Sequence, residues 1–141
     1  MFHIDSGEVE KITRFDKAKS RFTPHHEAGS TKAYIVHDNV LEFDILNQTF
    51  KVIGDLKLGR EDWPGVVTTK NYIYVFGGGM NSSTVERLSL AGNEESEEIP
   101  SSMFDKYSFF RKTFVFIPLR NKIITFGYNT AYSMLTFDEE S

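Results

Sequence analysis

Tyr72-Ile73-Tyr74-Val75-Phe76-Gly77-Gly78 is the stretch that decides the fold, because five apolar residues run directly into a glycine doublet. A short apolar run that is rich in aromatic and β-branched residues and is bounded by glycine is typical of a buried strand. A strand that turns sharply at its end often requires positive φ, which glycine adopts without the usual steric penalty. We therefore predict a buried strand over 72–76 and structural roles for Gly77 and Gly78.

Weaker copies of this strand flank it on both sides. Residues 33–38 lie 39 positions upstream, and residues 122–127, which end in Gly127, lie 50 positions downstream. Further strands are expected after each copy, at 40–44, 85–89 and 134–138, and then at 50–53 and 97–99. A period of about 40 to 50 residues with several short strands per unit is the signature of β-propeller blades.

The repeats divide the chain into four parts. Residues 1–13 read as the terminal strands of a preceding blade, followed by a first repeat at 14–53, a second at 54–99 and an incomplete third at 100–141. Pro24 and Pro64 interrupt two of the segments expected to supply a first strand. Because proline removes a ladder donor, we expect those strands to start after the proline or to carry a bulge. The predicted fold is all-β, with about three four-stranded antiparallel blades that belong to a larger or oligomer-completed propeller.

The order of features in each unit resembles the kelch repeat, and the resemblance covers nearly the whole chain. In the second unit Arg60 precedes the first strand, the glycine doublet ends the next, and Thr84-Val85-Glu86-Arg87 follows. In the first unit Phe43 and Phe50 stand seven apart, where the family has an aromatic pair. The chain departs from the family pattern in the second unit, which has Leu88 and a Glu-rich stretch instead of that pair. The resemblance implies a β-propeller that binds other proteins, as a substrate receptor or a scaffold.

The number of repeats leaves the architecture open. Propellers have about four to eight blades, whereas this chain supplies about three. An open stack of blades would expose two apolar faces that favour association. Three explanations remain: the chain is part of a longer parent chain, two copies form a homodimer through the open faces, or a partner covers them.

Composition argues against several classes of partner. The net charge is −4, and the basic residues are scattered rather than clustered, so no nucleic-acid surface is predicted. The absence of cysteine excludes disulfides and thiolate zinc sites and fits a reducing compartment. No stretch approaches the roughly 20 apolar residues of a membrane span, and the first residues lack the pattern of a signal peptide. We expect a cytoplasmic protein that does not bind membranes.

Catalytic and cofactor sites are not predicted. His25 and His26 are adjacent, and neighbouring side chains on a strand point to opposite faces, so they do not suit one metal ion. No Gly-x-Ser-x-Gly elbow occurs, and the paired carboxylates at 94–95 and 97–98 stand in polar turns where they stay ionised. We therefore expect no enzyme activity, metal or cofactor. A fragment of a kelch-fold enzyme, either a sugar oxidase or a sialic-acid-acting enzyme, and a degenerate repeat without function are the alternatives.

Candidate partner-binding residues come from the loops and the arginines. Propeller sites usually lie where loops gather on one face, and residues 78–83, with equivalents near 37–39 and 128–132, form one such set. Arginine is enriched in interface hot spots, so the candidates are Arg60, Arg87 and Arg111. Each arginine could instead make buried hydrogen bonds between blades, and this interpretation is favoured for Arg60.

Overall fold

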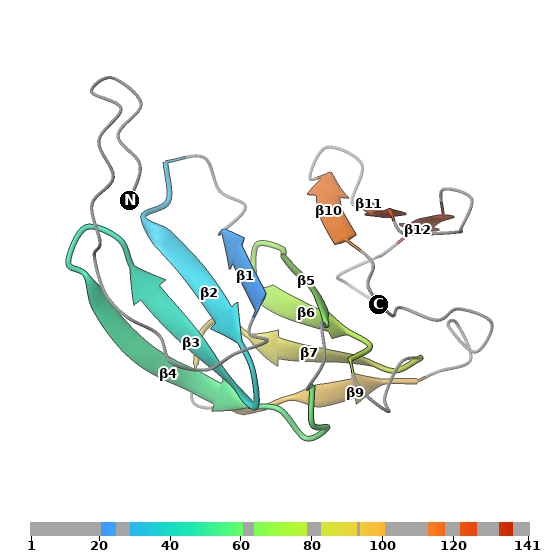
Figure 1. Ribbon diagram of the computed structural model, residues 1–141, viewed down its shortest axis with the longest axis horizontal. Coiled ribbons are helices and arrows are strands. Elements are labelled where there is room, and N and C mark those ends of the chain that lie inside the picture. Colours follow the sequence, from blue (N-terminus) through green and yellow to red (C-terminus); the bar gives the residue numbers. More distant parts are fainter. Residues whose placement is uncertain are drawn as a thin grey trace.

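Every regular element in the described part of the chain is a β-strand, which confirms the all-β prediction. The structure is a computed structural model of the 141-residue chain. It describes residues 21–24, 29–60, 64–78, 83–92, 94–100, 113–117, 122–126 and 133–136. The strands form three sheets (Figure 1).

The first sheet is built from consecutive antiparallel strands. Its members are β1 (Arg21–Pro24), β2 (Lys32–Val36), β3 (Asn39–Asp44) and β4 (Thr49–Asp55). The ladder between β3 and β4 has an irregularity between Val40 and Leu41. The short strand β8 (Glu94–Glu95) then pairs in parallel with β4 at the outer edge. The sheet thus gains a fifth strand from a distant part of the sequence.

The second and third sheets follow the same sequential order. The second contains β5 (Gly65–Thr68), β6 (Tyr72–Phe76), β7 (Val85–Ser89) and β9 (Glu97–Ile99), and the third contains β10 (Thr113–Ile117), β11 (Lys122–Phe126) and β12 (Ser133–Thr136). The strand β5 contacts both β1 and β10, so the first strands of the three sheets lie together. The sheets extend outward from this meeting point (Figure 1).

The ladders correct two details of the sequence-based prediction. The amide of Ile45 donates to the carbonyl of Thr31, and the equivalent bond in the second sheet runs from Leu90 to Asn71. Asn71 follows Thr31 by 40 residues, so the spacing of the first two copies is 40 rather than 39, and Tyr34 is equivalent to Tyr74. The expectation for Pro24 was also wrong, because β1 starts before this proline and has Pro24 as its last residue. A proline at the last ladder position still offers its carbonyl. The strand β5 does start after its proline, at Gly65.

The sheets stack face to face, and each turns the same face toward the next sheet along the chain. We call the face turned toward the next sheet along the chain the forward face, and the opposite one the rear face. The forward face of the first sheet packs against the rear face of the second, and the buried cluster comprises Tyr34, Val36, Val40, Ile53, Ile73, Val75 and Leu88. The forward face of the second sheet packs in turn on Ile123 of the third, in a cluster with Val67, Tyr74, Phe76 and Val85. Full burial of such a side chain contributes about 1.5–3 kcal/mol.

The topology gathers several connections at one edge of the first two sheets. Strand β2 ends there in the turn His37–Asp38, and β4 leads there into Leu56–Arg60. Strand β6 ends there at Gly77, and β7 begins there after Thr84. We call this set of residues at the strand ends the Gly77 edge; it comprises His37–Asp38, Leu56–Arg60, Gly77 and Thr84. Antiparallel strands place alternate connections on the same edge, so residues 37–39, 78 and 83 of the predicted loop set lie on one side of the molecule, while residues 79–82 and 128–132 lie outside the described residues.

Candidate functional site

Gly77 and Gly78 have the backbone conformation that the sequence predicted. Their φ angles are 61° and 102°, in the region that side chains with a Cβ rarely adopt. The amide of Gly77 donates to the carbonyl of Thr84 at 2.8 Å, which closes the base of the β6–β7 connection. The structural role predicted for the doublet is therefore to let the chain leave β6 while this closing bond forms.

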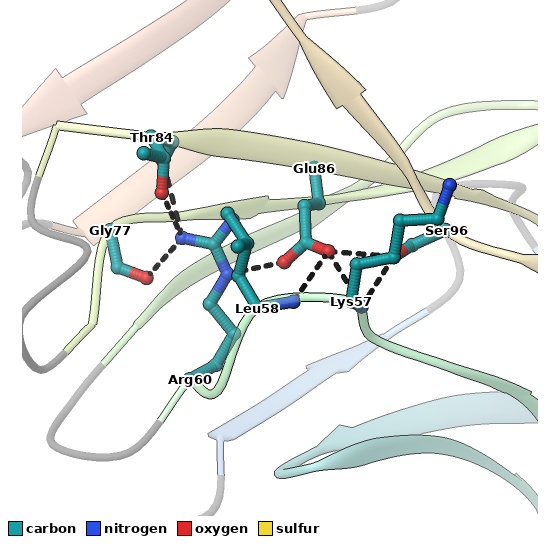
Figure 2. Close-up of polar contacts among 7 residues, drawn as sticks. All are labelled: Lys57, Leu58, Arg60, Gly77, Thr84, Glu86 and Ser96. Carbon is teal, nitrogen blue, oxygen red and sulfur yellow. Dashed lines mark hydrogen bonds and ion pairs between the residues drawn. The ribbon is translucent and has the colours of Figure 1, made fainter.

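Arg60 ties the two ends of the same connection together (Figure 2). Its Nη1 donates to the carbonyl of Gly77 at 2.8 Å and to Oγ1 of Thr84 at 2.8 Å. A longer bond of 3.3 Å reaches the carbonyl of Thr84. One planar guanidinium thus fixes the last residue before the connection and the last residue before β7. Such fixed donor geometry is what distinguishes arginine from lysine.

Glu86 on β7 neutralises this guanidinium and is the centre of a wider network. It accepts a bond of 2.6 Å from Nε of Arg60, and the side chains of both residues have 0% exposure. The other carboxylate oxygen accepts from the amides of Lys57 and Leu58, at 2.8 and 3.1 Å, and from the Ser96 hydroxyl at 2.7 Å. The network therefore fixes Lys57, Leu58 and Arg60, which follow the last long strand of the first sheet.

Burial makes the Arg60–Glu86 pair sensitive to the loss of either partner. Removal from water lowers the pKa of Arg60, and the adjacent Glu86 carboxylate partly offsets this effect. Nη2 of Arg60 is buried without a hydrogen-bond partner among the described residues. Charges removed from water are stable only with a well-placed counter-charge, and breaking such a pair typically costs about 3–5 kcal/mol.

Ser96 extends the network to the outer edge of both sheets. The amide of Ser96 donates to the carbonyl of Asp55 at 3.1 Å, and its hydroxyl accepts from the amide of Lys57 at 2.9 Å. The residues before it form β8 on the first sheet, and the residues after it form β9 on the second. One continuous segment therefore holds the two sheets together beside the Gly77 edge.

The predicted partner-binding arginines do not form one site. Arg60 is buried, with contacts that match its alternative role as a donor of internal hydrogen bonds. Arg87 lies on the forward face of β7, because neighbouring residues on a strand face opposite sides and Glu86 faces Arg60. Its side chain is 22% exposed, donates to Glu97 at 2.9 Å and lies 5.0 Å from the centre of the Tyr72 ring. Arg111 lies outside the described residues.

Arg87 keeps its charge in this partly exposed position. Burial acts to lower its pKa, but the hydrogen bond to Glu97 is among the interactions that outweigh burial, and the pKa lies above its ordinary value. The contact with Tyr72 is a cation–π interaction across the β6–β7 ladder. Of the two candidate arginines that the structure describes, Arg87 therefore is the one that presents its charge to solvent.

Phe43 and Phe50, predicted from the resemblance as an aromatic pair, face each other across the β3–β4 ladder. Their ring centroids are 4.6 Å apart and the rings stack with an interplanar angle of 26°. The turn beyond them is capped by Asp44, whose carboxylate accepts from the amides of Leu46 and Asn47 and from the Asn47 side chain. This pair lies at the opposite edge of the first sheet from the Gly77 edge. Gly127 lies outside the described residues.

The acidic residues of β8 on the first sheet and of β9 on the second are partly paired. Glu95 lies 3.4 Å from the Lys57 ammonium, and Glu97 binds Arg87. No group of three or more potential metal ligands occurs within the described ranges, and His25 and His26 lie outside them. The same ranges contain no helix long and apolar enough to cross a membrane.

Sequence reasoning missed Glu86, Ser96 and the backbone donors of Lys57 and Leu58. One signal was available, because a glutamate between the apolar residues Val85 and Leu88 of a predicted strand needs a hydrogen-bond or charge partner if it is buried. Comparison with known proteins does not add to this geometry: no family model matches the chain, and no curated protein matches it. The functional interpretation therefore depends on the contacts described above.

Proposed function

We propose that this chain is a kelch-type β-propeller module that binds a protein partner through the Gly77 edge. The observation that carries the proposal is the guanidinium of Arg60, which joins both ends of the β6–β7 connection. A loop whose base is already fixed loses less conformational entropy when a partner binds it. Loops held by a rigid scaffold are also where binding residues most often occur.

The arrangement of the sheets supports the propeller part of this proposal. Within each sheet the core strands pair in chain order, and the first strands β1, β5 and β10 lie together. Forward faces pack on rear faces at both junctions between sheets. The positive φ angles of Gly77 and Gly78 agree with the doublet on which the kelch resemblance depends.

The buried polar chemistry also favours binding over catalysis. General acid catalysis requires a carboxyl group that faces both an apolar pocket and the substrate. The oxygens of Glu86, the buried carboxylate of the described region, accept bonds from Arg60, Lys57, Leu58 and Ser96. This carboxylate stabilises the edge, so a substrate-receptor or scaffold role fits it better than turnover.

Two matched substitutions test the proposed binding edge. Ser83 and Asn71 are both exposed residues of the second sheet's connections, at opposite edges. We expect Ser83→Arg to reduce the recovery of specific partners at least tenfold, while Asn71→Arg leaves it unchanged. The measurement is quantitative affinity purification of the tagged wild type and both variants, each first shown to melt at the wild-type temperature. Equal recovery with Ser83→Arg, or equal loss with both variants, would contradict the proposal.

A further inference from the structure

Thr84 places a hydroxyl group at the end of the long β6–β7 connection, directly beside Arg60. Its Oγ1 accepts a hydrogen bond of 2.8 Å from Nη1 of Arg60. The residue is partly buried, and the exposed Ser83 precedes it. In the first sheet the equivalent residue is Asn39, because the His37 amide donates to its carbonyl as the Gly77 amide donates to that of Thr84. Of these two positions, only that in the second sheet therefore has a hydroxyl.

The guanidinium beside this hydroxyl has a nitrogen that its described partners do not use. Arg60 donates from Nε to Glu86 and from Nη1 to Gly77 and Thr84. Its Nη2 is buried without a hydrogen-bond partner among the described residues, and the side chain has 0% exposure. Every nitrogen of a guanidinium carries N–H donors, and a buried donor left without an acceptor is costly. An acceptor placed beside Nη2 would therefore be bound.

The position of Thr84 suits such an acceptor if the hydroxyl is extended by a phosphoryl group. Figure 2 shows Thr84 at the end of the guanidinium that points away from the Arg60 stem, while Glu86 lies at the Nε side. Both Nη atoms are bonded to the same carbon at that end. Phosphate oxygens are strong acceptors, and their paired bonds to a guanidinium are among the strongest in proteins. The guanidinium would also separate the phosphate from the Glu86 carboxylate.

We propose that Thr84 is phosphorylated and that its phosphoryl group binds both Nη atoms of Arg60. The donor is a nucleoside triphosphate bound to a protein kinase. A bond forms between Thr84 Oγ1 and the γ-phosphorus, the bond from this phosphorus to the bridging oxygen breaks, and the nucleoside diphosphate leaves. The hydroxyl proton passes to the catalytic base of the kinase. A phosphate opposite an arginine orders the segment that carries it, so the modification strengthens the hold on the connection between Gly77 and Thr84.

Phosphorus NMR tests the pairing of the phosphate with Arg60. The chain is made with phosphothreonine at position 84 and, as a matched control, at Thr49, which is exposed on β4 at the opposite edge. An exposed phosphothreonine has a second pKa of about 6. We expect the phosphate at position 84 to titrate about one pH unit below the control, because the adjacent guanidinium favours the dianion. An equal or higher pKa would overturn the proposal, and so would a position-84 form that no longer melts cooperatively.

Mass spectrometry tests whether the hydroxyl is modified. The purified chain is incubated with a cell extract, magnesium and a nucleoside triphosphate, beside Thr84→Val and the neighbouring control Ser83→Ala. We expect phosphate at Thr84 of the wild type, at least tenfold less phosphate in Thr84→Val, and no change in Ser83→Ala. A wild-type chain without phosphate at Thr84, or an equal loss in both variants, would overturn the proposal. Both tests measure the phosphate itself, so their outcome does not depend on partner binding.

Discussion

The first and second sheets share one ladder pattern but differ on their rear faces. Leu41 lies opposite Ile35 in the first sheet, and Glu86 lies opposite Val75 at the same position in the second. The first sheet has only the short turn His37–Asp38 to hold, whereas the second must hold the longer connection between Gly77 and Thr84. In the second sheet a buried ion pair thus fixes the ends of the long connection, and in the first sheet the apolar Leu41 stands at the same ladder position.

The forward faces differ in the sign of their charges. Glu42 accepts from the Lys32 ammonium at 2.9 Å and from the Tyr34 hydroxyl at 3.4 Å. Burial, and then the charge of Glu42, raise the pKa of Tyr34 well above its ordinary value. At the equivalent position the second sheet has Arg87, paired with Glu97. The ladder position therefore accepts either charge when a counter-charge is within reach.

The largest expected effect comes from breaking the pair that distinguishes the second sheet. Glu86→Gln keeps the size of the side chain but leaves the Arg60 guanidinium buried without a counter-charge. We expect the free energy of unfolding to fall by about 3–5 kcal/mol. Urea denaturation measures it.

The control for this change is the exposed ion pair between Arg87 on β7 and Glu97 on β9. Glu97→Gln removes the partner of Arg87 at the surface and should cost less than about 1 kcal/mol. If the two glutamines had equal effects, the buried network would not be what stabilises the second sheet.

A smaller loss is expected when the doublet of the second sheet is changed. Gly78→Ala places a Cβ at a φ of 102° and should cost about 1–2 kcal/mol. Gly59→Ala is the control, since its φ is not positive and a Cβ there has open space. The measurement is thermal unfolding of both variants. A loss at Gly59 as large as at Gly78 would show that the strain does not arise from φ.

Replacing Phe43 by the residue that the second sheet has at this position sharpens the comparison further. Phe43→Leu removes the stacking on Phe50 while keeping an apolar side chain like that of Leu88. We expect a loss of about 0.5–1.5 kcal/mol in denaturant unfolding. Leu46→Ala, in the exposed turn next to the pair, should change stability by less than about 0.5 kcal/mol. No difference between the two variants would exclude a stabilising role for the stacked rings.

The smallest effect concerns pH and the two turn caps. Asp44 caps its turn with a carboxylate, and Ser89 caps the equivalent turn with a hydroxyl. Bonds from Asn47 hold the pKa of Asp44 below its ordinary 3.8. The carboxylate therefore contributes stability above about pH 4, and this is lost as the pH falls through the native pKa. Asp44→Ser should thus be less stable than wild type at about pH 6, with the difference shrinking toward pH 3 in parallel urea titrations. A constant difference would contradict the assignment.

The elements of the fold that depend on local pattern could be predicted from the sequence. Strand β7 has the predicted bounds, Val85–Ser89, and β6 ends at the predicted glycine doublet. Alternation of apolar residues and the φ freedom of glycine are local properties, so they are visible in one segment. The predicted spacing between the first two copies was one residue too short. Two apolar runs can be aligned in more than one register, whereas the hydrogen bonds of the ladders identify a single register.

The candidate site was harder to predict because its contacts connect distant segments. Arg60 and Glu86 are both visible in the sequence, but their pairing depends on how β4 leads into the second sheet. The parallel pairing of β8 with β4 has no sequence signal, since Glu94 and Glu95 read as a solvated turn. At these positions the tertiary packing determines the structure, although the local sequence favours a solvated turn or an exposed side chain.

The most direct test of this account is amide hydrogen exchange at Lys57 and Leu58, the backbone donors to Glu86. We predict that both amides exchange slowly, like Val75 in the centre of β6, and that Glu86→Gln abolishes their protection first. Exchange of the wild-type amides as fast as that of the exposed turn residue Lys70 would contradict the claim that a buried network fixes the Gly77 edge.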